Sequence, residues 1–212
     1  MNDPPIPREV TIAPEEITKA AAILKGGGLV IIPTHGLYGI AADIFNPAAV
    51  DRVFTLKGRP KDKPLLALIN HIDMLNLLAK SVFHRAERLM NQLWPGQVTF
   101  VLHAQPDLPA GICSADGKIG VRLVAHPIAA ALIAAAGTPL TGTSANLSGQ
   151  SGCAVIDQIP EAVLAGVDMV LDAGTLAGGP GSTVVDITGE KPLILRQGAL
   201  AADAITTALN SA

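Results

Sequence analysis

The sequence predicts an α/β fold in which helices cover a largely buried sheet. Short apolar runs alternate with helical patterns along the whole chain, which is the order of elements in such folds. Apolar residues make up 49% of the chain and charged residues 16%, as expected for a protein with a packed core. No linker or internal repeat interrupts the pattern. We therefore expect one domain over residues 1–212, with 1–10 as a loose N-terminal arm.

The boundaries of the first elements carry clear signals. Pro14 suits the first turn of a helix, and the three glycines at 26–28 end that helix. The apolar run at 29–32 predicts a buried strand, and Asn46 and Pro47 begin the next helix. Further helices are expected at 72–78, 82–93, 127–135, 161–165 and 201–209. Further strands are expected at 65–69, 98–102, 119–123, 140–143, 169–171, 184–187 and 193–195, the last two paired through a turn.

Charge and cysteine content exclude several classes of protein. The formal net charge is −3, so the chain lacks the overall basic excess of many nucleic-acid-binding domains. Cys113 and Cys153 do not have the spacing of zinc ligands, so we expect reduced thiols and no metal held by the protein. No apolar run is long enough for a membrane span, and the first residues lack the apolar core of a signal peptide. These features predict a cytoplasmic protein without a membrane partner.

Four polar segments lie next to predicted strands, where ligand sites of α/β folds concentrate. The segment 57–64 holds four cations within seven residues, which suits a polyanion such as a triphosphate. The segments 33–39, 141–149 and 178–183 bring hydroxyl groups and glycines that are able to bind anions. Each segment alone is also compatible with a solvated turn, and the P-loop and GxGxxG motifs are missing. Together they predict a nucleotide or phosphorylated small-molecule site built from several loops.

Six ordered stretches of the chain resemble the YrdC/Sua5/TsaC family of threonylcarbamoyl-adenylate synthases. They are PTHGLYGIAAD at 33–43, LKGRPKDKPLLALI at 56–69, LWPGQVTFVL at 93–102, GVRL with HP at 120–127, TGTSANLSG at 141–149, and STVVD with LILRQG at 182–198. The chain is similar to the short members, which lack the C-terminal domain of the longer Sua5 proteins. The resemblance implies a YrdC/RibB-like fold, a single-domain twisted mixed sheet flanked by helices.

The resemblance also implies a reaction. L-Threonine and bicarbonate combine to an N-carboxy-threonine, and ATP adenylates it to L-threonylcarbamoyladenylate with release of pyrophosphate. Mg²⁺ is expected with ATP, and a tightly bound cofactor is not. Threonylcarbamoyl-transferase proteins would then carry the group to adenosine 37 of tRNA, giving t6A37, so tRNA is an indirect partner. The substrate supplies the nucleophile, so catalysis would consist of positioning and charge stabilisation.

The family motifs assign roles to particular residues of this chain. Those implied in catalysis are Lys57, Arg59, Ser144 and Asn146. Those implied in binding ATP are Lys57, Arg59, Ser144 and Arg196. Those implied in binding threonine are Thr34, Arg122 and Ser182. The chain departs from the family at His35-Gly36, where Glu-Thr is frequent, so its strictness for threonine is an open question.

Two other functions are alternatives. The first is a non-catalytic module that binds double-stranded RNA or tRNA directly through the same basic surface. The low aromatic content, 3%, argues against this reading because bases commonly stack on aromatic rings. The second is a carbamoyl-transfer domain like that of hydrogenase maturation proteins. That domain is expected beside zinc-finger-like cysteines, which this sequence does not contain.

Overall fold

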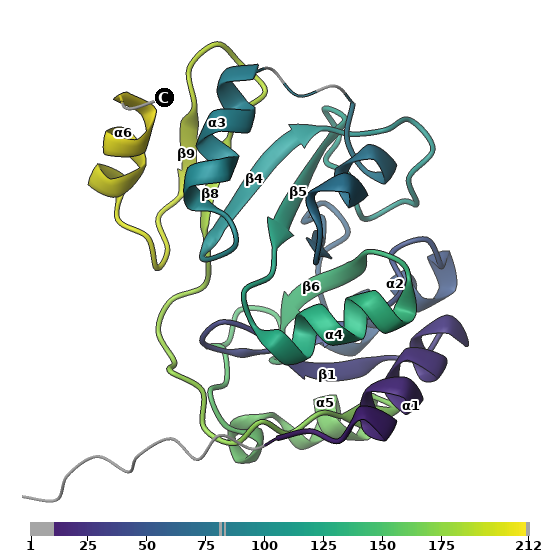
Figure 1. Ribbon diagram of the computed structural model, residues 1–212. Coiled ribbons are helices and arrows are strands. Elements are labelled where there is room, and N and C mark those ends of the chain that lie inside the picture. The colour runs from purple at the N-terminus through teal and green to yellow at the C-terminus, as the bar shows by residue number, and fades with distance from the viewer. Residues whose placement is uncertain (1–10, 81, 83, 211–212) are drawn as a thin grey trace, which may run out of the picture.

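The computed structural model describes residues 11–80, 82 and 84–210, and its central element is one mixed β-sheet (Figure 1). The N-terminal arm predicted at 1–10 lies outside the described residues. The nine strands of the described part are β1 (Val30–Pro33), β2 (Tyr38–Ala41), β3 (Leu66–Ile69), β4 (Val98–His103), β5 (Lys118–Leu123), β6 (Leu140–Ser144), β7 (Met169–Val170), β8 (Thr183–Asp186) and β9 (Leu193–Arg196).

The order of strands across the sheet is β7-β1-β2-β6-β3-β5-β4-β8-β9. Three neighbouring pairs are parallel: β7 with β1, β3 with β5, and β4 with β8. The other five pairs are antiparallel. The expected mixed sheet flanked by helices is therefore confirmed, as is the pairing of the two last strands.

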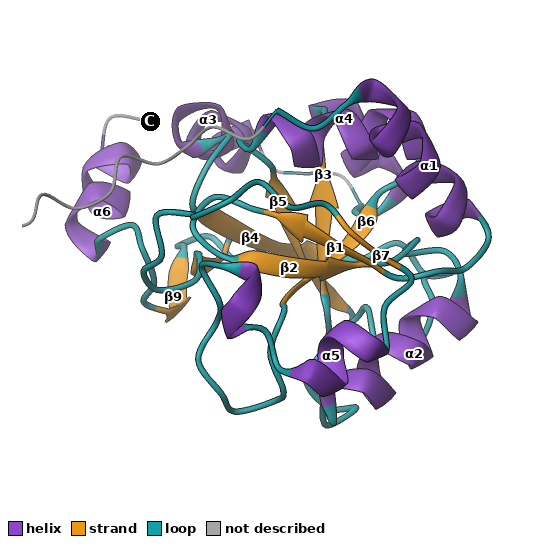
Figure 2. Ribbon diagram, turned by 90° about the horizontal axis from the view of Figure 1, so that it is seen from below, coloured by secondary structure: helices purple, strands orange, loops and turns teal. Residues whose placement is uncertain are grey.

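Helices cover both faces of the sheet. They are α1 (Pro14–Lys25), α2 (Pro47–Lys57), α3 (His84–Leu93), α4 (Pro127–Ala136), α5 (Glu161–Ala165) and α6 (Ala202–Asn210), with 3₁₀ helices η1 (Ile72–Leu77) and η2 (Ile156–Gln158). Figure 2 shows α1 and α4 on one side of the strands and α2 and α5 on the other. In the part of the chain described, no helix is both long and apolar enough to cross a membrane.

Alternation of side chains along β1 divides the core into two layers. Val30 and Ile32 pack with α1 and α4, whereas Ile31, between them, packs with α2. Successive side chains of a strand point to opposite faces, so a strand buried on both faces is apolar throughout. This is why the sequence shows a continuous apolar run at 29–32 instead of an alternating pattern.

Two local predictions differ from the structure. The segment 33–39 was singled out for its polar residues and was also compatible with a turn, and no strand was predicted there, but its end forms the start of β2, which pairs with β1 and with β6. Tyr38 and Ile40 favour a strand, but Gly36 and Gly39 interrupt the pattern, and pairing with strands on both sides stabilises β2. The helix expected at 72–78 is the 3₁₀ helix η1. Asp73 and Asn76 are of residue types that favour caps and turns over the interior of an α-helix.

Candidate functional site

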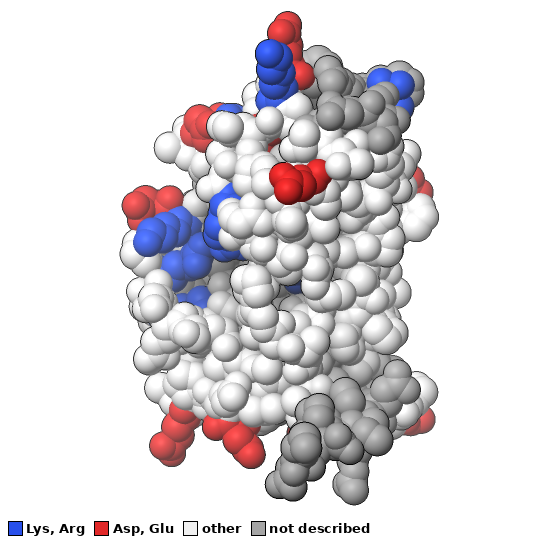
Figure 3. Space-filling view, turned by 90° about the vertical axis from the view of Figure 1, so that its left-hand side faces the viewer, with Lys and Arg blue, Asp and Glu red and all other residues white. Residues whose placement is uncertain are grey.

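A cavity of about 720 Å³ lies on one face of the sheet. Its floor is formed by β3, β4, β5, β8 and β9, and its walls include the loops after β1, α2 and β6. All four polar segments singled out in the sequence reach it, through Thr34, Arg59, Ser144 and Ser182. Figure 3 shows Lys and Arg side chains gathered in a hollow on this side of the molecule. The volume is within the usual range of small-molecule sites, about 300–1,000 Å³.

The floor of the cavity follows from strand register. Lys118, Gly120 and Arg122 alternate along β5, so all three face the cavity. Gly120 lies opposite Val101 of β4, which lies opposite Asp186 of β8. The side chains between them on these strands point the other way, into the core with α3. Gly120, which has no side chain, thus lies between the two cations of β5, Lys118 and Arg122.

Three arginines face one another across the cavity. Arg59 donates from Nε to Lys63 O (2.7 Å), and Arg196 donates from Nη2 to Ser182 O (2.7 Å). Burial, and secondly the charge of Arg196, lower the pKa of Arg122 to about 10. The same two causes lower the pKa of Arg59. No carboxylate of the described residues forms an ion pair with any of the three, so this part of the cavity is suited to a polyanion.

Arg122 has an unused donor. Its Nε is buried, and within the described residues nothing accepts a hydrogen bond from it. A buried donor without a partner costs about 1–3 kcal/mol, more when the group is charged. Because Arg122 lines the cavity, a bound anion is able to supply the missing acceptor.

A strap, residues 171–182, runs from β7 to β8 and passes the loop between β1 and β2 (Figure 1). That loop is closed by Thr34, whose hydroxyl donates to Leu37 O (2.6 Å). The strap contacts it where Gly178 N donates to Gly36 O (2.8 Å). A recess of about 30 Å³ between loop and strap opens beside Arg122.

Glycine at position 36 is required by this contact. A Cβ there would lie 2.2 Å from Gly178 O, which is backbone and cannot turn away. Any residue with a Cβ at this position is therefore incompatible with the observed path of the strap.

Lys57 and Asn146 lie beneath the cavity. They are 2% and 4% exposed, and the Lys57 ammonium donates to Ser144 O and Asn146 O. The other six residues with implied roles line the cavity: Thr34, Arg59, Arg122, Ser144, Ser182 and Arg196. The structure thus brings these six together and puts the remaining two behind the wall that carries Ser144.

Comparison with known families agrees with this geometry. The profile of the Sua5, YciO and YrdC proteins, described as "Telomere recombination", matches residues 22–198. The chain belongs to the Sua5/YciO/YrdC family. The resemblance seen in the sequence is confirmed.

Individual members of the Sua5/YciO/YrdC family are similar over most of this chain. Threonylcarbamoyl-AMP synthase of Pyrococcus abyssi is 36% identical over 87% of this chain and 54% of its own length. A putative threonylcarbamoyl-AMP synthase of Mycobacterium tuberculosis is 34% identical over 91% and 88%. The structure of P. abyssi Sua5 with L-threonine superimposes with a TM-score of 0.89, at 34% identity over 94% of this chain and 58% of that one. The chain spans little more than half the length of the P. abyssi relative.

The structure of this Sua5/YciO/YrdC member adds a charged cluster that sequence reasoning missed. Lys118 Nζ lies 2.9 Å from Asp186 and 3.1 Å from Asp116, at the far end of the cavity floor from Arg122. Burial raises the pKa of Asp186, but hydrogen bonds from Thr188 and Lys118 outweigh it and hold the pKa below its usual value. The alternation of Lys118 and Arg122 along one strand was the only signal in the sequence.

The acidic residues of the cavity are engaged by a lysine. Across the described part of the chain, no three His, Cys, Asp or Glu side chains are grouped to hold a metal ion. Asp116 and Asp186, which line the cavity, are both paired with Lys118.

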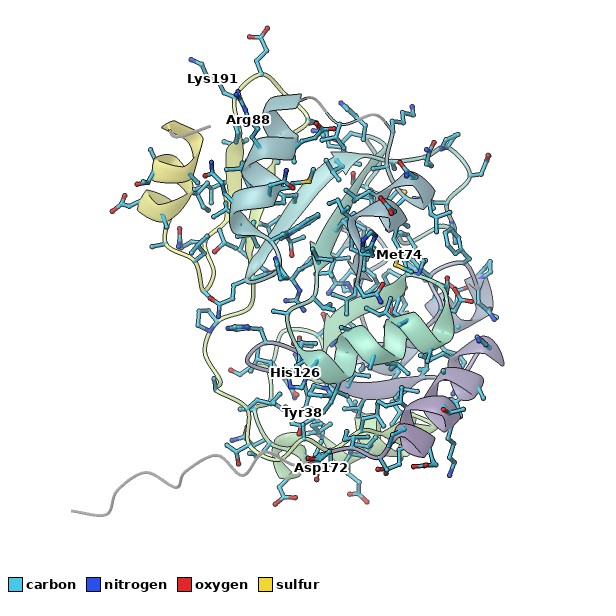
Figure 4. The ribbon with its side chains drawn as sticks, in the orientation of Figure 1. Tyr38, Met74, Arg88, His126, Asp172 and Lys191 are labelled. Atoms are coloured by element: carbon cyan, nitrogen blue, oxygen red, sulfur yellow. The ribbon has the colours of Figure 1, made fainter. Side chains whose placement is uncertain are left out.

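The hydroxyl of Tyr38 anchors the start of the strap (Figure 4). It accepts from Ala173 N (2.9 Å) and lies within hydrogen-bond distance of Asp172 (3.0 Å) and Gly174 O (2.8 Å). Burial, the largest of several causes, raises the pKa of Tyr38 to about 12, so the hydroxyl keeps its proton at neutral pH.

We expect Tyr38→Phe to lower the free energy of unfolding by about 1–2 kcal/mol, because the Ala173 N–H loses its acceptor while the ring still packs. Urea unfolding followed by circular dichroism measures the change. A variant as stable as the wild-type protein would show that the strap does not depend on this hydroxyl.

Proposed function

We propose that this chain synthesises L-threonylcarbamoyladenylate from L-threonine, bicarbonate and ATP, with release of pyrophosphate and of the water lost when the threonine amine and bicarbonate form the carbamate. The observation that carries the proposal is the convergence of Arg59, Arg122 and Arg196, unpaired with carboxylates of the described residues, in one cavity. The names of the relatives, and the structure of one of them with L-threonine, support the same reaction.

In this proposal Arg122 binds the carboxylate of threonine. Its guanidinium fork matches two carboxylate oxygens, and its unpaired Nε supplies one of the donors. Thr34 and Ser182 lie beside it on the cavity wall and are proposed to contact the same substrate. The Ser182 hydroxyl is fixed by Thr99, at 2.7 Å between the two oxygens.

ATP is proposed to bind with its phosphates near Arg59 and Arg196 and with Ser144 at the reacting end. The carbamate oxygen of N-carboxy-threonine attacks the α-phosphorus, a new P–O bond forms, and the bond to the bridging oxygen breaks. Pyrophosphate leaves with the electron pair of that bond. The arginines offset the negative charge that grows on the leaving group, and no side chain becomes covalently attached.

Magnesium is proposed to arrive with the ATP phosphates, since the carboxylates of the cavity are engaged by Lys118. The product is proposed to serve t6A37 formation in the cytoplasm, with transferase proteins carrying the group to tRNA. Direct contact with RNA is not needed for this role.

The test is pyrophosphate release from ATP by the full chain with magnesium. We expect release to require both threonine and bicarbonate, and to be weaker with serine. Folded protein that releases no pyrophosphate with any amino acid would sink the proposal. Binding of tRNA or double-stranded RNA by that same protein that is tight at moderate salt would favour the RNA-binding alternative instead.

A further inference from the structure

Lys57 makes three hydrogen bonds to the segment 144–148. Its ammonium donates to Ser144 O and to Asn146 O, the latter at 2.5 Å. Its own carbonyl accepts from Ser148 N (2.8 Å). The residue is 2% exposed, so these contacts replace solvent almost completely.

The end of α2 explains why Lys57 and Arg59 point in different directions. Asn46 caps the start of the helix by accepting from Ala49 N, and Gly58 ends it in the left-handed conformation, with φ 57°. A left-handed residue at this position reverses the chain. Lys57 therefore remains on the buried face of the helix, while Arg59 lies beyond the turn and faces the cavity.

The segment that Lys57 holds carries Ser144 on the cavity wall. The carbonyl of Ser144 points to Lys57, and the amide of the same peptide group, Ala145 N, donates to Tyr38 O of β2 (2.9 Å). This peptide group is thus fixed from both sides, which sets the direction of the Ser144 side chain.

Burial of the charged Lys57 ammonium costs free energy, which indicates that the ammonium has a role beyond packing. Burial, followed by the charge of Arg59, lowers the pKa of Lys57 to about 8, and only the Cys153 thiol opposes them. Among the described residues, Arg59 and Cys153 are the titratable groups whose charges act on the ammonium. A buried cation held by neutral carbonyls is usually less stabilising than an apolar side chain of similar size. The presence of a lysine at position 57 is better explained by the 144–148 segment that it holds in place than by a contribution to the stability of the fold.

We propose that Lys57 is a positioning residue, which holds the 144–148 segment so that Ser144 faces ATP, and does not contact the phosphates. This inference rests on the proposed function and replaces, for this residue, the phosphate contact that the family resemblance implied. Of the Lys-x-Arg pair, Arg59 is then the one that meets the polyanion.

Binding of nucleotides with one, two or three phosphates distinguishes a residue that contacts the phosphates from a residue that positions Ser144. A residue that touches the phosphates should contribute more to binding ATP than to binding AMP, whereas a residue that acts through Ser144 should affect both alike. We expect Lys57→Met, which keeps the length of the side chain, to weaken AMP, ADP and ATP binding by the same factor of about ten. The matched control Arg59→Met should weaken ATP at least about ten times more than AMP. Isothermal titration calorimetry with magnesium measures both series.

Kinetics supply a second readout. In Lys57→Met we expect kcat for pyrophosphate release to fall about tenfold, with KM for threonine within about twofold of wild type, since Arg122 is untouched. A loss of ATP affinity that grows with phosphate number, as in the control, would overturn the inference and leave the proposed function standing. Wild-type protein that binds neither AMP nor ATP would overturn both.

The wild-type protein gives a test that does not depend on folding of a variant. Lys57 loses its proton as pH rises through about 8, while the charges of AMP and ATP are constant from about pH 7.5 upward. We expect AMP and ATP affinities to fall together, by equal factors, between about pH 7.5 and 9. An additional loss of about tenfold for ATP alone would show that the ammonium meets the phosphates.

Discussion

Arg122→Lys is expected to lower kcat/KM for threonine by about 100-fold, because a lysine keeps the charge but loses the fork that binds two carboxylate oxygens. Arg122 lies on β5 at the border of the main cavity and the small recess, and its buried Nε has no acceptor among the described residues. The single ammonium of a lysine lacks the planar pair of N–H donors that matches both carboxylate oxygens at once. Initial rates of pyrophosphate release at varied threonine concentration measure the effect.

Two measurements distinguish a role of Arg122 in threonine binding from a general loss of structure in the variant. We expect the dissociation constant for ATP to stay within about threefold of wild type, because Arg59 and Arg196 remain. The control is Arg52→Lys, since Arg52 lies away from the cavity and bonds to Gly27 O and Asp168. Its kinetics should be those of the wild-type protein. If Arg122→Lys raised KM for ATP and left KM for threonine unchanged, Arg122 would belong to the nucleotide side of the cavity.

Gly36→Ala is expected to lower the free energy of unfolding by about 1–3 kcal/mol and to raise KM for threonine about tenfold. The new Cβ would lie 2.2 Å from Gly178 O, so the strap must move away from the loop that carries Thr34. The hydrogen bond from Gly178 N to Gly36 O would be lost with it. Chemical denaturation and threonine-dependent rates measure the two effects.

The matched control for this substitution is Gly189→Ala, in the turn between β8 and β9. The nearest atom to a Cβ at that position is Lys191 O at 3.9 Å, an ordinary contact. We expect its stability to change by less than about 0.5 kcal/mol and its kinetics not at all. A Gly36→Ala variant that behaved like this control would show that the strap yields freely and does not shape the threonine site.

The sequence was sufficient for the fold class and for the segments that build the site. Strand and helix alternate because each apolar run needs a partner to cover it, and that pattern is local enough to read directly. The four polar segments were found because they lie next to predicted strands, where ligand sites of α/β folds concentrate. Six of the eight residues that the family motifs indicated line one cavity.

Tertiary structure alone decided which way the side chains point. Lys57 and Arg59 are two residues apart and equally basic, yet a left-handed glycine between them puts one in the core and the other in the cavity. β2 exists because two other strands pair with it, and the cluster of Lys118 with Asp186 forms across an intervening strand. The reason is physical: strand pairing and side-chain burial depend on residues far away in sequence, which local preference does not encode.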